Sequence, residues 1–315
     1  MKNKIFITGG AGYIGTTLIP LLLENDYEVT VYDSLLFNNG DKLLPHITHA
    51  KFNFIKGDIR DGELLKESVK GFDVVIHLAA LVGFPICRQL GDTEAHSVNT
   101  DGTKMVIDSL LPNQYLLFGS TGSNYGEVEG VCTEETPLNP LTAYGVTKTE
   151  AEHLVMDRPN STAFRFATAF GVSPRLRLDL LVNDMTHKAH TEGYAVIYES
   201  HFMRTFIHVK DIANVFLFAI NNQEDTIDEV FNVGSNKMNH SKKEVCELIQ
   251  SELPKTYFNY ADVDGDPDKR NYIVSYEKIN DLGFDTTISL EEGIKELVKT
   301  FPLIKITSNY HNVSK

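Results

Sequence analysis

The stretch Thr8-Gly9-Gly10-Ala11-Gly12-Tyr13-Ile14-Gly15 decides the fold of this chain. It follows a short apolar run, residues 5–8, that has the composition of a buried strand. It opens an amphipathic segment that continues to about residue 24 and is long enough for a helix. A glycine-rich turn between a strand and a helix is the first unit of an α/β fold that binds dinucleotides.

Each glycine of this turn has a separate physical task. Gly9 permits the tight turn, Gly12 lets a pyrophosphate approach the backbone, and Gly15 lets the helix pack against the strand. The N-terminus of the helix then offers free N–H groups and a positive dipole end to phosphate. We therefore predict that this turn, including Tyr13 and Ile14, binds the diphosphate of a dinucleotide. The alternative is a glycine turn with a purely structural role.

Strands and helices alternate through the first half of the chain. Strands are predicted at residues 5–8, 28–33, 52–56, 74–77, 114–119 and 161–166. Helices are predicted between some of them, at 61–70, 93–111 and 143–157. Such alternation indicates parallel strands joined by right-handed crossovers, and runs rich in Val, Ile and Phe fit a sheet that is covered on both faces. The predicted fold class is α/β, a doubly wound Rossmann parallel sheet with a smaller mixed α/β C-terminal domain.

The pattern becomes irregular after about residue 172. A helix at 210–221, a strand at 229–233 and two amphipathic helices at 242–252 and 290–300 are still recognisable. We expect residues 1–172 to form the dinucleotide-binding domain, with 210–234 returning to it. The substrate-binding domain would comprise residues 173–209 and 235–315, and its polar tail at 307–315 is expected to fray.

Composition and charge exclude several classes of protein. Apolar residues make up 42% and charged residues 23% of the 315 residues, as in an ordinary globular protein. The formal net charge of −14 disfavours nucleic acid and anionic membrane as partners, but it allows a small ligand that carries phosphate. No apolar run approaches the ~20 residues of a membrane span, so we expect a cytoplasmic protein.

The cysteines Cys87, Cys132 and Cys246 lack CxxC spacing and predict neither disulfides nor a zinc site, and no metal is expected.

The cofactor preference depends on Asp33, which ends the second predicted strand. An acid at this position accepts hydrogen bonds from the hydroxyls of the adenosine ribose and repels a 2′-phosphate. The following residues, Ser34, Leu35 and Leu36, include no arginine that would neutralise that phosphate. The sequence therefore favours NAD over NADP as the cofactor, and an aspartate that merely ends a strand in a turn is the alternative.

Three residues form a candidate catalytic set. Tyr144 and Lys148 are four residues apart at the start of a predicted helix, which places them on one face, one turn apart. A tyrosine with an ordinary pKa of ~10 is a poor base at neutral pH. A neighbouring ammonium stabilises the phenolate and so lowers this pKa. Thr121 lies in a hydroxyl-rich segment after the fifth strand, where it can orient a reacting alcohol. Tyr and Lys often occur at this spacing by chance, so the prediction depends on the combination with Thr121.

Further motifs occur in order along the chain. They are TGGAGYIG (8–15), GDIRD (57–61), HLAA (77–80), Asn99 with Gly102-Thr103, STGSNYG (120–126), YGVTK (144–148), RTFIHVKD (204–211) and FNVG (231–234). With these motifs the chain resembles, over nearly its whole length, the extended short-chain dehydrogenases of the NAD-dependent sugar-nucleotide epimerase/dehydratase family. The resemblance implies NAD as the cofactor, a nucleotide-diphosphate sugar as the substrate, and a homodimer built through residues 93–111 and 143–157.

The resemblance also assigns roles by position. The residues implied around the cofactor, beyond the glycine turn and the catalytic set, are Asp58 and Ile59 at the adenine, Leu78, Ala79 and Ala80 along its length, and Asn99 as support for a loop. The residues implied on the substrate side are Thr121, Ser123, Thr168, Asn183, Arg204 and Arg270. Arg204 and Arg270 would bind the substrate diphosphate, because a planar guanidinium donates two hydrogen bonds at once. For either arginine, a salt bridge to a surface acid is the alternative.

Departures from the family pattern narrow the reaction. Dehydratases of the family carry Asp-Glu directly after the catalytic threonine, whereas this chain has Gly122 and Ser123, so a 4,6-dehydratase is not expected. Thr168 stands where many members have a substrate-binding asparagine. Residues 171–183 and 266–275 resemble a subfamily that includes UDP-glucose 4-epimerase-like proteins and capsular GDP-heptose 4-dehydrogenases.

The expected reaction is oxidation at C4 of a nucleotide-diphosphate sugar through a 4-keto intermediate. In a 4-epimerase the keto sugar takes the hydride back on its other face, and in a net 4-dehydrogenase the keto sugar leaves. The resemblance favours the epimerase and leaves the dehydrogenase open. A non-catalytic dinucleotide-binding sensor is a third hypothesis, which is disfavoured because such proteins commonly lose the tyrosine or the lysine and both Tyr144 and Lys148 are present.

Overall fold

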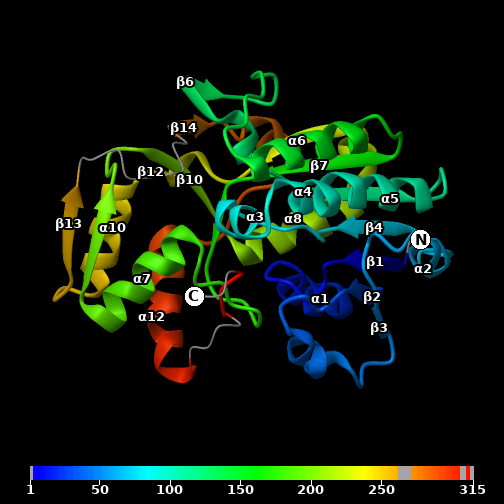
Figure 1. The fold of residues 1–315 in the computed structure, drawn as a ribbon, viewed down its shortest axis with the longest axis horizontal. Coiled ribbons are helices and arrows are strands. Elements are labelled where there is room, and N and C mark those ends of the chain that lie inside the picture. The colour runs from blue at the N-terminus through cyan, green and yellow to red at the C-terminus, as the bar shows by residue number, and fades with distance from the viewer. Residues whose placement is uncertain (1–2, 262–270, 306–309, 313–315) are drawn as a thin grey trace.

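The computed structural model describes residues 3–261, 271–305 and 310–312, and its centre is a seven-stranded sheet (Figure 1). The strands are β1 (Lys4–Thr8), β2 (Glu28–Asp33), β3 (Phe52–Lys56), β4 (Val74–His77), β5 (Tyr115–Thr121), β7 (Ser161–Phe166) and β11 (Glu229–Val233). All neighbouring strands are parallel, in the order β11-β7-β5-β4-β1-β2-β3. The predicted strands of this sheet are confirmed, with shifts of one or two residues at the ends of β1 and β5.

The order in which successive strands are added to the sheet reverses at β1. From β1, the strands β2 and β3 extend the sheet to one side, and the strands β4, β5, β7 and β11 extend it to the other. This order is that of a doubly wound Rossmann sheet, so the predicted fold class is confirmed. Such sheets bind ligands in the crevice outside the carboxyl ends of the strands at the point where the order reverses.

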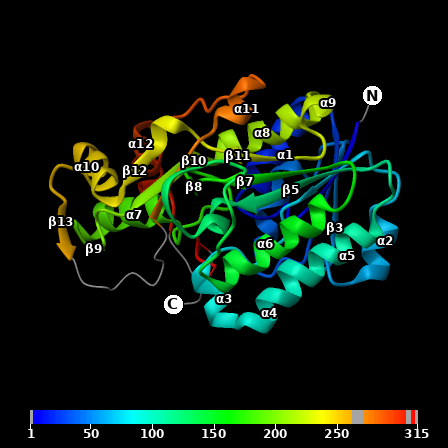
Figure 2. The same cartoon turned by 90° about the horizontal axis from the view of Figure 1, so that it is seen from above.

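Both faces of the sheet are covered by helices, and the strand sequences explain why. In β1, Ile5 and Ile7 enter a core shared with α1 (Gly15–Glu24) and α8 (Val209–Asn221). Phe6 points the other way, into a core shared with α2 (Gly62–Ser68), α5 (Gly102–Ser109) and α6 (Ala143–Met156). The two helix layers lie on opposite sides of the sheet in Figure 2. Apolar side chains on both faces of one strand are what a buried parallel sheet requires.

The helical stretch predicted at 93–111 is interrupted. It consists of α4 (Asp92–His96), one π-helical turn at Ser97–Asp101, and α5. A π turn inside a helix commonly marks a functional site. This turn carries Asn99, one of the residues predicted to support the cofactor loop. The helix before it, α3 (Phe84–Leu90), was not predicted, although a proline at its first turn is a typical helix start.

A second, smaller core lies beside the sheet, on the left in Figure 1. It is formed largely by α7 (Leu181–Glu192), α10 (Lys242–Glu252) and α12 (Leu290–Thr300), with the parallel pair β9 (Tyr194–Tyr198) and β13 (Tyr257–Ala261) against them. The predicted bounds of α10 and α12 are confirmed. Both helices begin with a capping box, Ser241 with Glu244 and Ser289 with Glu292, so local sequence fixes their starts.

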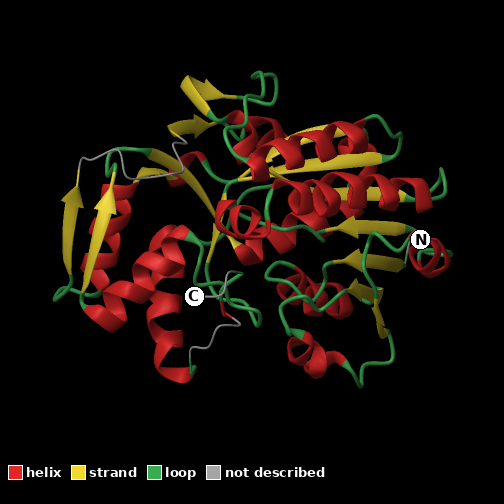
Figure 3. Ribbon diagram, in the orientation of Figure 1, coloured by secondary structure: helices red, strands yellow, loops and turns green. Residues whose placement is uncertain are grey.

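Short elements complete the fold (Figure 3). They are η1 (Gly40–His46), η3 (Gly122–Tyr125), β6 (Glu127–Cys132), β8 (Thr168–Phe170), β10 (Met203–His208), α9 (Gln223–Thr226), η4 (Asn236–Met238), β12 (Asn239–Ser241), β14 (Asn271–Val274), α11 (Glu277–Asp281) and η5 (Phe301–Leu303). β10 pairs with β8 and β12, and β14 pairs with β6. The three cysteines are buried and free. None of the helices in the described part of the chain has the length and apolar character needed to cross a membrane.

Candidate active site

A cavity of about 850 Å³ opens at the carboxyl ends of the sheet strands. Seventeen of the predicted site residues line it: Gly9, Gly12, Tyr13, Ile14, Gly15, Asp33, Asp58, Ile59, Leu78, Ala79, Ala80, Thr121, Ser123, Tyr144, Lys148, Thr168 and Arg204. Asn99 and Asn183 are buried and do not contribute to this lining. Arg270 lies outside the described residues. The predicted cofactor, catalytic and substrate residues thus meet in one space, although they come from distant parts of the chain.

The glycine turn fits the diphosphate of a dinucleotide. Gly9 has a φ of +72°, and a Cβ there would lie 2.5 Å from the amide nitrogen of Ala79. A Cβ on Gly15 would lie 2.4 Å from the carbonyl oxygen of Gly10. At Gly12, by contrast, a Cβ would meet only the carbonyl of Gly9, at 3.1 Å, and this position faces the cavity. The turn therefore leaves room for a ligand at the N-terminus of α1, where phosphate is favoured.

Asp33 stands at the end of β2 with its carboxylate fixed. Its Oδ2 accepts a hydrogen bond from the amide of Ala11 at 3.0 Å, and its Oδ1 accepts one from the amide of Leu35 at 2.8 Å. Burial raises the pKa of this carboxyl above its ordinary value, and the two amide bonds oppose that shift. A carboxylate has about four acceptor sites, so it can also accept hydrogen bonds from ribose hydroxyls.

Asp58 and Ile59, after β3, form another part of the wall. Arg60 grips the Asp58 carboxylate through Nε at 3.0 Å and Nη2 at 2.7 Å. The bond to Arg60 lowers the pKa of Asp58, so this side chain stays ionised. Ile59 is buried against α5, where a Cβ on Gly102 would lie 2.6 Å from its side chain. Close packing of α5 therefore sets the position of Ile59 in the cavity.

Asn99 supports the loop after β4 without lining the cavity. Its Oδ1 accepts a hydrogen bond from the amide of Leu81 at 2.7 Å, and its Nδ2 donates to the carbonyl of Leu81 at 3.1 Å. The same Nδ2 also donates to Oγ1 of Thr147, at 3.1 Å, on α6. The π turn thus ties the loop that carries Leu78 to Ala80 to the helix that carries the candidate catalytic residues.

The candidate catalytic residues occupy two adjacent element ends. Thr121 ends β5, and its Oγ1 accepts a hydrogen bond from the amide of Ser123 at 3.1 Å. Tyr144 and Lys148 lie in the first two turns of α6, which begins where Thr142 caps the amide of Gly145 at 3.1 Å. Thr121, Tyr144 and Lys148 all line the cavity.

Lys148 is buried, with only 3% of its surface exposed. Its Nζ lies 3.8 Å from the centroid of the Phe118 ring. Burial lowers the pKa of this ammonium to about 7, and the charge of Glu152 opposes the shift. A cation in such an environment is stabilised by any anion that forms beside it, and a tyrosinate one helical turn away is such an anion.

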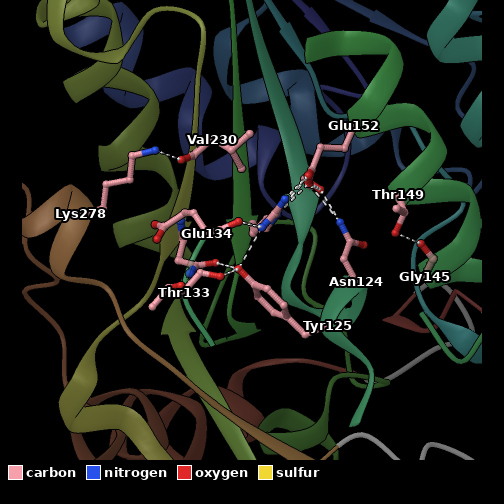
Figure 4. A network of polar contacts seen from close by, with 12 residues as sticks. Asn124, Tyr125, Thr133, Glu134, Gly145, Thr149, Glu152, Val230 and Lys278 are labelled. Carbon is pink, nitrogen blue, oxygen red and sulfur yellow. Dashed lines mark hydrogen bonds and ion pairs between the residues drawn. The ribbon is translucent and has the colours of Figure 1, made fainter. Parts of the chain in front are cut away.

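Beneath this site lies a buried polar network around Glu152 (Figure 4). Glu152 pairs with Arg165 through Oε1 and Nη2 at 2.7 Å. Its Oε2 accepts hydrogen bonds from Ser120 Oγ at 2.5 Å and from Asn124 Nδ2 at 3.0 Å. Ser120 and Asn124 flank Thr121 and Ser123 in sequence, so the network fixes the segment that carries them.

The predicted substrate residues have distinct environments. The Oγ1 of Thr168 is buried at the cavity wall, and among the described residues it has no hydrogen-bond partner. Arg204 is buried, and its Nη1 donates to the carbonyl of Met203 at 3.1 Å. Asn183 accepts from the amide of Gly171 at 3.0 Å and donates to the carbonyl of Arg177 at 2.8 Å. Its contacts are with the chain itself, so Asn183 shapes the wall from behind.

Several charged residues of the cavity were not singled out from the sequence, among them Arg175, Arg177 and Asp179. Arg177 donates to Asp179 from Nε at 3.1 Å and from Nη2 at 2.6 Å. Burial alone would raise the pKa of Asp179, but the charge and hydrogen bonds of Arg177 hold it below its ordinary value. The available signal was the segment 173–179, where arginines alternate with buried leucines and so point away from the core.

Comparisons with known proteins place this geometry in a family. The sequence model of the NAD dependent epimerase/dehydratase family matches residues 5–234. The low-salt glycan biosynthesis protein Agl12 of Haloferax volcanii is 30% identical over 310 residues, which cover 93% of this chain and 97% of that protein. A UDP-glucose 4-epimerase of Corynebacterium glutamicum is 28% identical over 78% of this chain and 79% of its own length.

A solved structure agrees with these sequence relatives. The UDP-glucuronic acid 4-epimerase of Bacillus cereus, in complex with UDP-glucuronic acid and NAD, superimposes with a TM-score of 0.85 at 25% identity. The match covers 95% of this chain and 99% of that chain. The family match spans most of the chain and includes the glycine turn, Asp33 and the Tyr144–Lys148 pair. The chain therefore belongs to the NAD-dependent epimerase/dehydratase family, and its cofactor is NAD.

Proposed function

We propose that the protein is an NAD-dependent sugar-nucleotide 4-epimerase, which inverts C4 of a nucleotide-diphosphate sugar through a 4-keto intermediate. One observation carries the proposal: Thr121, Tyr144 and Lys148 line the same cavity as the glycine turn. An acid–base pair and a nucleotide site in one space fit oxidation of a bound alcohol. The named 4-epimerases among the relatives support this reaction class.

In this mechanism the glycine turn and Asp33 would hold NAD, which would supply the acceptor and donor of a hydride at C4 of the sugar. Tyr144, as the phenolate, removes the proton from the C4 hydroxyl and later gives it back. Lys148 stabilises that phenolate from one turn along α6, and its burial makes the stabilisation strong. Thr121 donates a hydrogen bond to the reacting oxygen and holds it toward Tyr144. No residue at 122 or 123 can act as a carboxyl acid or base, which agrees with retention of the C6 hydroxyl.

The two predicted domains would bind different ligands. Residues 1–172, with 210–234, would hold NAD, with Asp33 at the adenosine ribose. Residues 173–209 and 235–315 would hold the nucleotide-diphosphate sugar. Arg204 offers a buried guanidinium there, and Thr168, from the adjoining end of the first segment, offers a hydroxyl that has no hydrogen-bond partner among the described residues. Arg270 would complete the proposed substrate side, and Asn183 would support its wall from behind. The protein would act in the cytoplasm.

We further propose a homodimer through the segments 93–111 and 143–157, where α4, α5 and α6 lie on the same face of the sheet (Figure 2). Light scattering at micromolar concentration tests this assembly. A mass of twice 35.3 kDa supports it, and a monomer contradicts it.

The experiment that tests the reaction is incubation of the purified protein with UDP- and GDP-linked hexoses and heptoses. NMR follows the sugar, and absorbance follows reduction of the cofactor. A C4 epimer that forms without net NADH is the expected result. A 4-keto sugar with stoichiometric NADH would instead establish the 4-dehydrogenase. Binding of NAD without any sugar turnover, even with the whole panel, would favour the non-catalytic sensor.

A further inference from the structure

Arg175 is the largest fully buried side chain of the described residues, with 2% of its surface exposed, and it lines the cavity. Its Nη1 donates to the carbonyl of Leu176 at 3.1 Å, and its Nη2 donates to Oδ1 of Asn312 at 2.9 Å. The guanidinium also lies 5.3 Å from the centroid of the Phe37 ring. Every one of these partners is neutral.

A buried cation with only neutral partners is unusual, because removal of a charge from water is costly unless an opposite charge compensates it. The charge of the Asp179 carboxylate favours the cationic form of Arg175, but both oxygens of this carboxylate are hydrogen-bonded to Arg177. Burial, and then the charge of Arg177, lowers the pKa of Arg175 to about 10. The guanidinium therefore stays charged at neutral pH and lacks a dedicated anion within the described part of the chain.

The position of Arg175 identifies the missing anion. Its amide donates to Oγ1 of Thr16 at 3.3 Å, and Thr16 belongs to the first turn of α1. Two residues earlier, Ser173 Oγ donates to the carbonyl of Tyr13, in the glycine turn, at 2.7 Å. Phe37 belongs to the loop that follows Asp33. The side chain thus lies between the helix N-terminus and the adenosine side of the cavity, where the diphosphate of a dinucleotide binds.

We propose that Arg175 is the counter-ion of the NAD diphosphate, and that Asn312, near the C-terminus, orients it for this task. Asn312 bonds to Arg175 through Oδ1, and through Nδ2 it donates to the carbonyl of Val82 at 3.3 Å. The carbonyl of Tyr310 accepts from the amide of Leu178 at 2.7 Å and fastens the same segment. This role goes beyond the proposed reaction and does not depend on which sugar is turned over.

The test compares ligands with and without a diphosphate on protein freed of nucleotide. NAD, ADP-ribose, adenosine and UDP are titrated into the wild type and into Arg175→Met, by calorimetry and by thermal shift. Arg158→Met is the matched control, because Arg158 also donates to backbone carbonyls but lies outside the cavity. We expect Arg175→Met to weaken NAD and ADP-ribose roughly 10- to 100-fold, the loss of a charge-assisted hydrogen bond, while adenosine changes little. Arg158→Met leaves all four affinities unchanged.

Other outcomes overturn the proposal. An equal loss for adenosine and ADP-ribose would assign Arg175 a structural role, and unchanged ADP-ribose binding would exclude the diphosphate contact. A loss for UDP with NAD unchanged would place the substrate diphosphate at Arg175 instead. If Arg175→Met does not fold, Asn312→Ala decides. It frees the guanidinium without removing it, and it should weaken ADP-ribose several-fold and leave adenosine unchanged. An unchanged ADP-ribose affinity in Asn312→Ala would then contradict the proposal.

Discussion

The two ends of the cavity are formed by different parts of the residues, main chain at one end and side chains at the other. The cofactor end is made of backbone: a glycine turn in which a side chain at Gly9 or Gly15 would overlap neighbouring main chain, and the N-terminus of α1. The proposed sugar end is made of side chains that line the cavity, among them the Arg177–Asp179 pair, Arg204 and Thr168. A backbone site is tied to the fold and cannot change without it. A side-chain site can change by substitution, so one fold can serve many sugars.

The largest expected effect comes from the residue between the two ends. Tyr144→Phe removes the proposed base and keeps the ring, so turnover should fall by about 10²- to 10⁴-fold. NAD affinity should change little. Steady-state turnover and NAD titration measure the two quantities, and Tyr257→Phe, at an exposed tyrosine, is the control. Full activity in Tyr144→Phe would show that another group moves the proton.

The sugar end is the next to test. Arg177→Met leaves the Asp179 carboxylate buried without its partner, which should lower the free energy of unfolding by about 3–5 kcal/mol. Replacing both partners, in Arg177→Met/Asp179→Leu, should restore most of this stability. NAD binding should survive in the double variant, whereas binding of the nucleotide sugar should weaken. Urea unfolding and separate titrations check this, and a double variant with normal sugar turnover would separate the pair from the substrate.

A pair of glycine variants tests the cofactor end. Gly9 and Gly71 both have positive φ, +72° and +78°, but a Cβ on Gly71 meets nothing within 4 Å. Gly71→Ala should therefore cost only the backbone strain, about 1–2 kcal/mol. Gly9→Ala adds overlap with Ala79 and should lose more stability together with NAD binding. Equal unfolding free energies for the two variants would mean that the turn is less tightly packed than its geometry shows.

The same contrast explains what sequence can reveal. The strands and the glycine turn were predictable because backbone constraints leave strong local patterns, such as apolar runs and glycines at fixed spacing. The caps Ser241 and Ser289 likewise mark the starts of α10 and α12 in the sequence itself. A helix start at Pro85 and the π turn at Ser97–Asp101 were missed. The π turn depends on tertiary contacts of Asn99, which no local pattern encodes.

Sites formed by side chains were harder to predict, because the role of a polar side chain depends on whether the fold buries it. The segment that contains Arg175 and Arg177 has the composition of a solvent-exposed surface segment. Only the fold shows that both side chains are buried in the cavity. Asn183 was expected at the substrate, but its amide bonds to Gly171 and to the backbone of Arg177. Placement of a polar residue behind or in front of a wall is a property of packing, not of sequence spacing.

The smallest expected effect concerns the charge at the reacting end. The pKa of Lys148 is about 7 in the folded protein and 10.5 for an ordinary lysine, so the folded state releases its proton first. Between these values the unfolded chain binds more protons, and the stability of the wild type therefore rises with pH. Burial of the ammonium is thus destabilising at pH 7, and this cost fades toward pH 10.

Lys148→Met removes this titration. The variant should unfold at higher urea concentration than the wild type at pH 7, and its advantage should shrink by about 1–3 kcal/mol between pH 7 and pH 9. Lys104→Met, at an exposed lysine paired with Asp108, should show no such trend. A constant difference between Lys148→Met and the wild type over this range would mean that Lys148 titrates as an ordinary lysine. The ammonium of Lys148 would then be hydrated rather than buried, and it would stabilise the phenolate of Tyr144 less.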